Sequence, residues 1–339
     1  MHGFAGSLSY KRRPVTDPLR IYHDPLVLRH GTGAFHPEGP GRVAAAVGAL
    51  EAEGFAMHRP PSPERTRGSI SLVHDPAYVE RLREAASLGP DDDDRPFTLF
   101  DSPDNPMSRS TFEVAERTVG LLLAAIDDVM AGSARRGFVV TRPPGHHARS
   151  AEAMGFCFFN AVAVAARDAQ RRHGAGRILV ADFDVHHGNG TQETFWEDGS
   201  VAYLSVHRYP FYPGTGGLHE TGSGPGLGLT VNVPLGAGAG DETYAGGFES
   251  ALDGLLRRFR PDLVLVSAGF DAHRRDPLGG MGLSGEGYFR MTRALSAAAD
   301  TFASGRLVSV LEGGYDPAGM AEGALAHARA LAETGEPSH

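Results

Sequence analysis

Short runs of apolar residues recur along this chain, and each has the length of one β-strand. The runs span residues 137–141, 177–183, 201–206, 262–268 and 306–312. They are almost continuous in Val, Leu and Ile, which is typical of parallel strands that are covered on both faces. We therefore predict that these segments form a buried, mainly parallel sheet.

Segments with helical periodicity lie between several of these strands. They span residues 110–131, 160–172, 241–259, 285–303 and 318–333. Strands that alternate with helices indicate an α/β fold with helices on both faces of the sheet. Glycine and proline are spread along the chain, and the acidic stretch at 88–96 lies between two helical patterns and not between two cores. We predict a single domain over residues 1–339.

Composition excludes several classes of protein. The chain has 32 Lys and Arg against 41 Asp and Glu, and its net charge of −9 argues against direct nucleic-acid binding. A single cysteine, Cys157, cannot form an internal disulfide, which favours a reducing compartment. Residues 1–17 lack the apolar segment of a secretory signal, and no apolar run approaches the ~20 residues of a membrane helix. We predict a cytoplasmic protein with no membrane partner, and a homo-oligomer stays open.

A polar, glycine-rich segment follows each predicted strand. These segments read RPPGHHA (142–148), DVHHGNG (184–190), HRYPFYPGTG (207–216), GFDAH (269–273) and GGYD (313–316). Open α/β folds bind ligands outside the carboxyl ends of their strands. We therefore expect the five segments to converge on one crevice.

The segment around 182–187 carries candidate metal ligands. Asp182, Asp184 and His186 share one face of a strand, and carboxylate oxygen with imidazole nitrogen suits zinc. The Asp-x-His pattern by itself fits a solvated surface turn equally well. Four ionisable groups behind a buried strand favour the metal site, because unpaired buried charge is costly. His187 points to the opposite face, and we predict a structural role for it.

A catalytic zinc usually takes three protein ligands, so a third is expected from another strand end. Asp271 follows the apolar run 262–268. Alone it would more simply cap the next turn. Beside the cluster at 182–187 it is the best candidate for the third ligand.

Three further features point to catalysis in the same crevice. His146 and His147 lie on a loop stiffened by two prolines, and histidine is the natural general base near neutral pH. The hydroxyl of Tyr315 could stabilise an oxyanion, although a tyrosine that packs a loop is commoner. Phe156 and Tyr212 could wall a channel for an alkyl chain, although most such aromatics are core residues.

Together these motifs, with HPEGPGR (36–42), GFCFFN (155–160) and NVPL (232–235), resemble the histone deacetylase and acetylpolyamine amidohydrolase superfamily, in its class II-like bacterial branch. The resemblance follows the same order over nearly the whole chain. It implies an arginase-like α/β domain with an eight-stranded parallel sheet.

The resemblance also implies an activity and its main residues. It assigns one Zn²⁺ per chain to Asp184, His186 and Asp271, although iron(II) can occupy such sites. It implies hydrolysis of an N-acetyl amide by metal-activated water, with His147 as general base and His146 as its electrostatic partner. The substrate would be an acetylated lysine side chain of a peptide or protein, or an acetylpolyamine.

Supporting roles follow from the same resemblance. Asp182 would orient His146, Asn189 would support His147, and Tyr315 would stabilise the transition state. A structural K⁺ is implied near Asp182 and Ser205. The implied substrate tunnel is lined by Gly155, Phe156, Tyr212 and Leu278.

Three alternatives to an acyl-lysine deacetylase stay open. Leu278 stands where vertebrate polyamine deacetylases carry an acidic residue, which favours acyl-lysine. The acidic run at 91–94, Asp101 or Asp104 could supply that acidic group instead. An arginase-like binuclear hydrolase would need further carboxylates where Asn189 and His273 stand. A catalytically inactive acetyl-group binding protein would typically lack a ligand or Tyr315.

Overall fold

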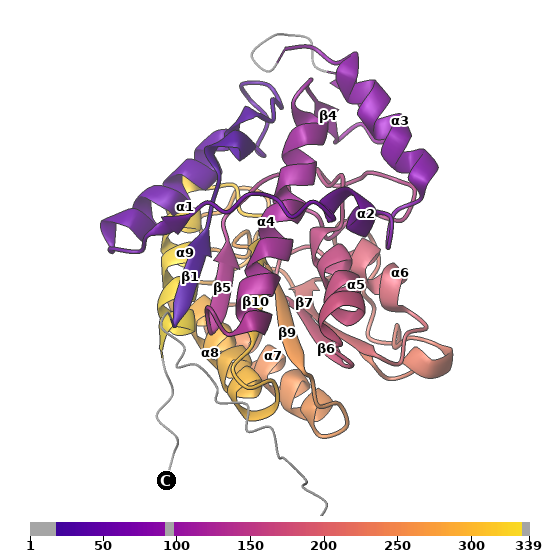
Figure 1. The fold of residues 1–339 in the computed structure, drawn as a ribbon. Coiled ribbons are helices and arrows are strands. Elements are labelled where there is room, and N and C mark those ends of the chain that lie inside the picture. The colour runs from indigo at the N-terminus through magenta and orange to yellow at the C-terminus, as the bar shows by residue number, and fades with distance from the viewer. Residues whose placement is uncertain (1–17, 92–97, 334–339) are drawn as a thin grey trace, which may run out of the picture.

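The computed structural model of the protein describes residues 18–91 and 98–333. Residues 1–17, for which we predict no signal segment, therefore lie outside the described residues. The same holds for the acidic residues 92–94 of the 88–96 loop. The described residues form one α/β domain (Figure 1). Its predicted extent to residues 1 and 339 stays a prediction.

A central sheet of eight strands runs through the domain in the order β2-β1-β5-β10-β9-β6-β7-β8. All its ladders are parallel, as predicted. The strands are β1 (Leu19–Tyr22), β2 (Met57–His58), β5 (Arg136–Val139), β6 (Ile178–Asp182), β7 (Val201–Arg208), β8 (Thr230–Leu235), β9 (Leu263–Ala268) and β10 (Leu307–Leu311). A separate antiparallel pair joins β3 (Thr98–Leu99) to β4 (Pro106–Met107).

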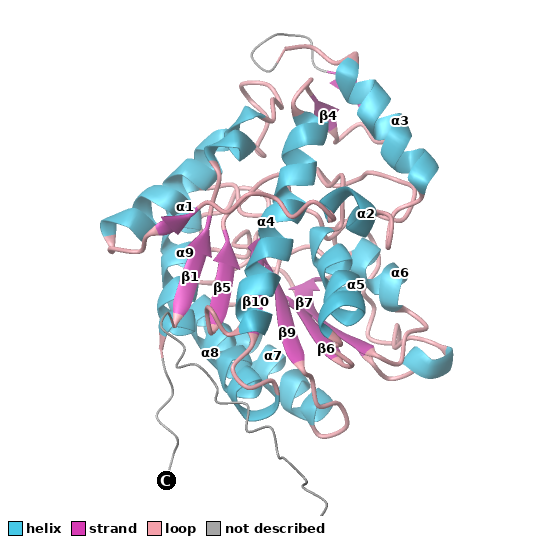
Figure 2. Cartoon of the chain, in the orientation of Figure 1, coloured by secondary structure: helices cyan, strands magenta, loops and turns pink. Residues whose placement is uncertain are grey.

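Helices cover both faces of the sheet, as the alternation of strands and helices predicted (Figure 2). One layer contains α2 (Thr66–Ile70), α3 (Pro76–Ser87), α4 (Thr111–Ala131), α5 (Ala161–His173) and α6 (Asn189–Phe195). The other contains α1 (Pro40–Ala52), α7 (Asp241–Leu256), α8 (Gly285–Phe302) and α9 (Pro317–Ala332). Two 3₁₀ helices span Pro25–Arg29 and Gly224–Gly226. Among the described residues, no helix is both long enough and apolar enough to cross a membrane.

The four strands β5, β10, β9 and β6 are buried at every residue, which explains their continuous apolar sequences. Helix boundaries follow local polar signals as well. Asn160 begins α5 because its side chain accepts a hydrogen bond from the Ala163 N–H, and Gly174 ends the helix in the left-handed conformation. The positions of these strands and of this helix therefore follow from nearby residues, through apolar runs and side-chain caps.

The sequence pattern did not predict β1, β2, β8 or α1. β2 has only two residues, and β8 lies at the sheet edge with four of its six residues partly exposed. Helix α1 is rich in Ala and Gly, which give little contrast between its buried and exposed faces. These elements depend on their neighbours, because their own sequences carry weak periodicity.

A buried ion cluster joins the start of α1 to the loop after β5. Glu38, Arg42 and Arg142 are all buried. The Nε of Arg142 lies 3.0 Å from Glu38 Oε1, and the Nη1 of Arg42 lies 3.1 Å from the same oxygen. Burial opposes ionisation of Glu38, but the charges of Arg142 and Arg42 hold the pKa of its carboxyl below its ordinary value. The cluster fixes two loops that border the carboxyl edge of the sheet.

We predict that Glu38→Ala lowers the free energy of unfolding by about 3–5 kcal/mol, because it leaves two buried guanidinium groups without their carboxylate. Chemical denaturation followed by circular dichroism measures this. Glu80→Ala, which removes the exposed partner of Arg83 in α3, is the control and should leave the unfolding midpoint unchanged. Equal midpoints for Glu38→Ala and the parent chain would contradict the prediction.

Candidate active site

The loops that follow five neighbouring strands meet at the carboxyl edge of the sheet. These strands are β5, β10, β9, β6 and β7, which are adjacent in the sheet order. A narrow cavity opens among the loops and is lined by Asp104, His147, Gly155, Phe156, His186, Tyr212, Leu278 and Tyr315. The structure thus brings together the segments that the sequence expected to converge.

His186 lines this cavity, and Asp184 and Asp271 contact its imidazole. The Nδ1 of His186 is 3.1 Å from Asp184 Oδ1 and 3.1 Å from Asp271 Oδ2. One donor atom of each side chain lies within 4.8 Å of the others. Because β6 and β9 pair directly, the residues just beyond their ends face one another.

Two glycines make room for these carboxylates. A Cβ added to Gly269 would lie 2.1 Å from Asp184 Oδ2, and one added to Gly313 would lie 2.1 Å from Asp271 Oδ2. Gly313 also donates its N–H to Asp184 Oδ2 at 2.8 Å. Any larger residue at either position would displace a candidate ligand.

The electrostatics of the three side chains fit a divalent cation. Burial and the neighbouring charge of Asp184 raise the pKa of Asp271 above its ordinary value. Burial would lower the pKa of His186, but hydrogen bonds to Asp184 and Asp271 raise it to about 9. Two buried carboxylates and one imidazole with convergent donor atoms form a ligand set that zinc-type ions prefer.

His146 is held beside this group by Asp182. The Nδ1 of His146 donates to Asp182 Oδ2 at 3.0 Å, and the Tyr203 hydroxyl donates to the same oxygen at 3.0 Å. Burial opposes protonation of His146, but the charges of Asp184 and Asp182 raise its pKa to about 10. Asp182 therefore lies where it can orient His146, and the pair keeps a positive imidazolium in the centre.

His147 has the opposite environment. Its Nδ1–H donates to the Asn189 side-chain oxygen at 2.8 Å, which leaves Nε2 as the acceptor nitrogen. Burial, together with the positive charges of His146 and His186, lowers the pKa of His147 well below its ordinary value. A neutral imidazole with a free Nε2, at the wall of the cavity, can accept a proton.

Tyr315 reaches the same cavity from the loop after β10. Burial, with the charges of Asp271 and Asp184, raises the pKa of its hydroxyl well above the ordinary value, so the hydroxyl stays a donor. Its backbone N–H donates to Asp276 Oδ2 at 2.6 Å, while Asp276 Oδ1 accepts from Leu278 N–H at 2.9 Å. Asp276 thus links Tyr315 to the cavity wall, a role that the sequence did not indicate.

Aromatic side chains wall the cavity. The ring of Phe156 lies edge-on to Tyr315 at 5.7 Å, and that of Tyr212 lies edge-on to His147 at 5.1 Å. A Cβ on Gly155 would lie 2.4 Å from a ring carbon of His147, so this position requires glycine. With Leu278, the residues proposed for the tunnel lie together.

His187 and Ser205 lie outside this cavity lining. The two ring nitrogens of His187 contact Thr215 Oγ1 at 2.7 Å and Gln192 Oε1 at 3.0 Å, which agrees with the predicted structural role. Ser205 lies opposite Asp182 in the β6–β7 ladder, and its hydroxyl contacts His207 Nδ1 at 2.8 Å. The K⁺ near Asp182 and Ser205 stays a prediction.

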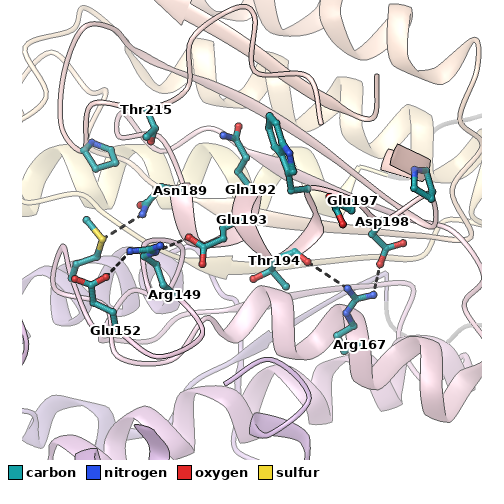
Figure 3. A pocket seen from close by; sticks show the side chains of 15 residues that line it. Arg149, Glu152, Arg167, Asn189, Gln192, Glu193, Thr194, Glu197, Asp198 and Thr215 are labelled. Carbon is teal, nitrogen blue, oxygen red and sulfur yellow. Dashed lines mark hydrogen bonds and ion pairs between the residues drawn. The ribbon is translucent and has the colours of Figure 1, made fainter. Parts of the chain in front are cut away.

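Asn189 lines a second, larger hollow of about 1210 Å³ (Figure 3). Its basic side chains are paired with acidic neighbours, as with Arg149 and Glu193 at 2.6 Å. The side-chain oxygen of Asn189 accepts from His147, while its Nδ2 donates to Met154 Sδ at 3.3 Å. The candidate metal ligands do not line this hollow.

We predict that Asp184→Ala reduces bound metal from about one ion per chain to near zero, because two protein ligands hold such ions poorly. Elemental analysis of zinc-equilibrated, dialysed protein measures this. His187→Gln, which changes the neighbouring histidine that contacts none of the three ligands, should keep its metal. Retention of one stoichiometric ion by Asp184→Ala would refute the ligand assignment.

Comparison with known proteins places the chain in a family. The histone deacetylase domain matches residues 36–331. The chain is 38% identical to "Histone deacetylase 10, chloroplastic" of Oryza sativa subsp. japonica over 99% of this chain and 78% of that protein. It is 37% identical to the histone deacetylase-like amidohydrolase of Pseudomonas aeruginosa over 90% of this chain and 83% of that protein.

A solved structure gives the same result. The crystal structure of the HDA15 HD domain superposes with a TM-score of 0.86 at 35% identity, and covers 93% of this chain and 88% of that one. These matches confirm the predicted resemblance and fold, and they support a deacetylase or amidohydrolase activity. The chain belongs to the histone deacetylase family.

Proposed function

We propose that this protein is a zinc-dependent deacetylase that hydrolyses the acetyl amide of acylated lysine side chains. One observation carries the proposal: His186 of the Asp184, His186 and Asp271 ligand set lines the same narrow cavity as the neutral imidazole of His147. A metal-ligand set beside a general base is the arrangement that amide hydrolysis by water requires.

The roles of the residues follow from their contacts. A Zn²⁺ held by the three ligands would supply Lewis acidity and lower the pKa of water towards ~7. His147 takes the proton of the attacking water at Nε2, since its Nδ1–H is engaged by Asn189. His147 then returns a proton to the departing amine. Tyr315 donates its hydroxyl hydrogen to the oxygen of the former carbonyl as charge develops there.

The two adjacent histidines, His146 and His147, are held in different protonation states. The charges of Asp184 and Asp182 keep His146 protonated, and the positive charge of His146 then disfavours a proton on His147 in the resting site. His147 is consequently ready to accept a proton. Two imidazoles with pKa values moved in opposite directions are a recurrent means of assigning one role to each group.

The cavity wall favours an acyl-lysine chain over an acetylpolyamine. Phe156 and Tyr212 offer apolar faces to a methylene chain, and Leu278 offers no charge to a second ammonium group. Asp104 is the observation that favours the alternative, because its carboxylate also lines the cavity and could attract a cationic amine. An acetylpolyamine amidohydrolase is therefore the second candidate function.

A binuclear hydrolase and an inactive binding protein both have less support. Within the described residues, one group of three metal-ligand side chains is found, whereas a binuclear arginase-like centre requires more carboxylates. An inactive acetyl-group binding protein would have no need of Tyr315 and His147 beside the ligand set. A cytoplasmic location remains part of the proposal and is independent of the chemistry.

We predict that Tyr315→Phe lowers kcat on an acetyl-lysine peptide by about 10²-fold or more, the scale of one lost oxyanion donor. Steady-state kinetics with the zinc-loaded enzyme measure this, and the metal content should not change. Tyr209→Phe removes a hydroxyl from a partly exposed tyrosine outside the cavity lining and serves as the control. Unchanged turnover in Tyr315→Phe would remove this hydroxyl from the mechanism.

We predict that kcat/KM for an acetyl-lysine peptide exceeds that for acetylputrescine and acetylspermidine by about tenfold. This ratio corresponds to a difference of ~1.4 kcal/mol in transition-state stabilisation. Leu278→Glu should shift this ratio towards the acetylpolyamines, because a carboxylate at the wall attracts their free ammonium groups. Leu278→Gln is the matched control, because glutamine has the size of glutamate without its charge. A parent enzyme that prefers acetylspermidine would favour the second candidate function.

A further inference from the structure

Glu312, which directly follows β10, is a buried carboxylate with no role in the chemistry proposed above. Its side chain is 1% exposed. Its Oε2 accepts the backbone N–H of Gly145 at 2.6 Å and that of His146 at 3.2 Å. Its Oε1 accepts the hydroxyl hydrogen of Ser267, on β9, at 3.0 Å. One side chain thus joins the ends of three neighbouring strands.

The two N–H groups that Glu312 accepts immediately precede His147. The peptide plane between Gly145 and His146 sets the direction in which both imidazoles leave the loop, because φ and ψ are the soft torsions of the backbone. The backbone at Gly145 packs closely against the next segment, since an added Cβ would lie 2.6 Å from the Phe159 carbonyl oxygen. Glu312 therefore contacts the loop at the point that orients the candidate base.

The backbone around Glu312 is itself fixed. Its N–H donates to the Ala268 carbonyl at 3.0 Å, and its carbonyl accepts from the buried guanidinium of Arg42. The next residue, Gly313, donates to the candidate metal ligand Asp184 at 2.8 Å. The same short segment consequently contacts both the metal ligands and the loop of the base.

We infer that Glu312 is a positioning residue that sets the His146–His147 loop against the metal ligands, through the reach of its two oxygens and not through its charge. The inference rests on the proposed deacetylase function, because it concerns the base of that reaction. Geometry and charge can be separated at this position. Glu312→Gln keeps an oxygen at the same reach and removes the charge, whereas Glu312→Asp keeps the charge and withdraws the carboxylate from the Gly145 N–H.

The test compares these two variants as full-length, zinc-loaded protein. We expect Glu312→Asp to lower kcat on an acetyl-lysine peptide by about 10–100-fold, the usual effect of a base displaced by ~1 Å, with KM changed less than about threefold. Glu312→Gln should remain within about fivefold of the parent kcat, since one amide oxygen can accept both N–H groups. Equal losses in both variants, or a greater loss in Glu312→Gln, would overturn the inference.

Hydrogen–deuterium exchange gives a readout that does not depend on activity. Exchange in the peptide covering residues 143–148 should accelerate in Glu312→Asp and stay at the parent rate in Glu312→Gln. Ser267→Ala leaves Glu312 in place but removes the hydroxyl that holds its Oε1, and should accelerate the same peptide to a smaller extent. Parent-like exchange in both Glu312→Asp and Ser267→Ala would overturn the inference even if activity falls.

A control and a second outcome keep the two proposals separate. Asp168→Asn removes the charge of another buried carboxylate, which lies outside the cavity lining. This carboxylate accepts a hydrogen bond from the hydroxyl of Ser69, on α2, at 2.7 Å. The substitution should lower stability without changing kcat or exchange at 143–148. If the parent enzyme hydrolyses no acetyl substrate, the proposed function fails, while the exchange measurements still decide the role of Glu312.

Discussion

The burial of negative charge at one edge of the sheet is the constraint on which this structure depends. The carboxylates of Asp182, Asp184, Asp271 and Glu312 are buried together where the central strands end. A buried carboxylate is stable only if hydrogen bonds or opposite charges replace its water. The surrounding loops supply backbone N–H groups and two imidazoles, and the Asp184–His186–Asp271 group retains the charge that a divalent cation would neutralise.

This constraint explains how loops without regular secondary structure hold precise positions. Asp276 accepts the N–H groups of Leu278 and Tyr315, and Glu312 accepts those of Gly145 and His146. Each carboxylate thus joins segments that are far apart in sequence. Catalytic groups need to be held within a fraction of an ångström, and a carboxylate can accept several N–H groups from different segments at once.

The same charges assign different states to the two adjacent histidines. His146 faces Asp182 and is held protonated, while His147 faces a neutral amide and is held neutral by the charge beside it. An aspartate in place of Asn189 would stabilise a proton on His147. Asn189 adds no negative charge behind this candidate base, so burial and the positive charges of His146 and His186 hold the pKa of His147 low.

The sequence by itself determined the central strands, the helices between them and the types of chemical group at the strand ends. Continuous apolar runs and the polar motifs that follow them are local features, so Asp184, His186 and His147 could be picked out before their distances were known. Only the tertiary structure decided which strands are neighbours, and it alone assigned Glu312 and Asp276 to the loops they hold. Their hydrogen bonds join residues up to 167 positions apart, and no local pattern of residues encodes the partner of a buried carboxylate.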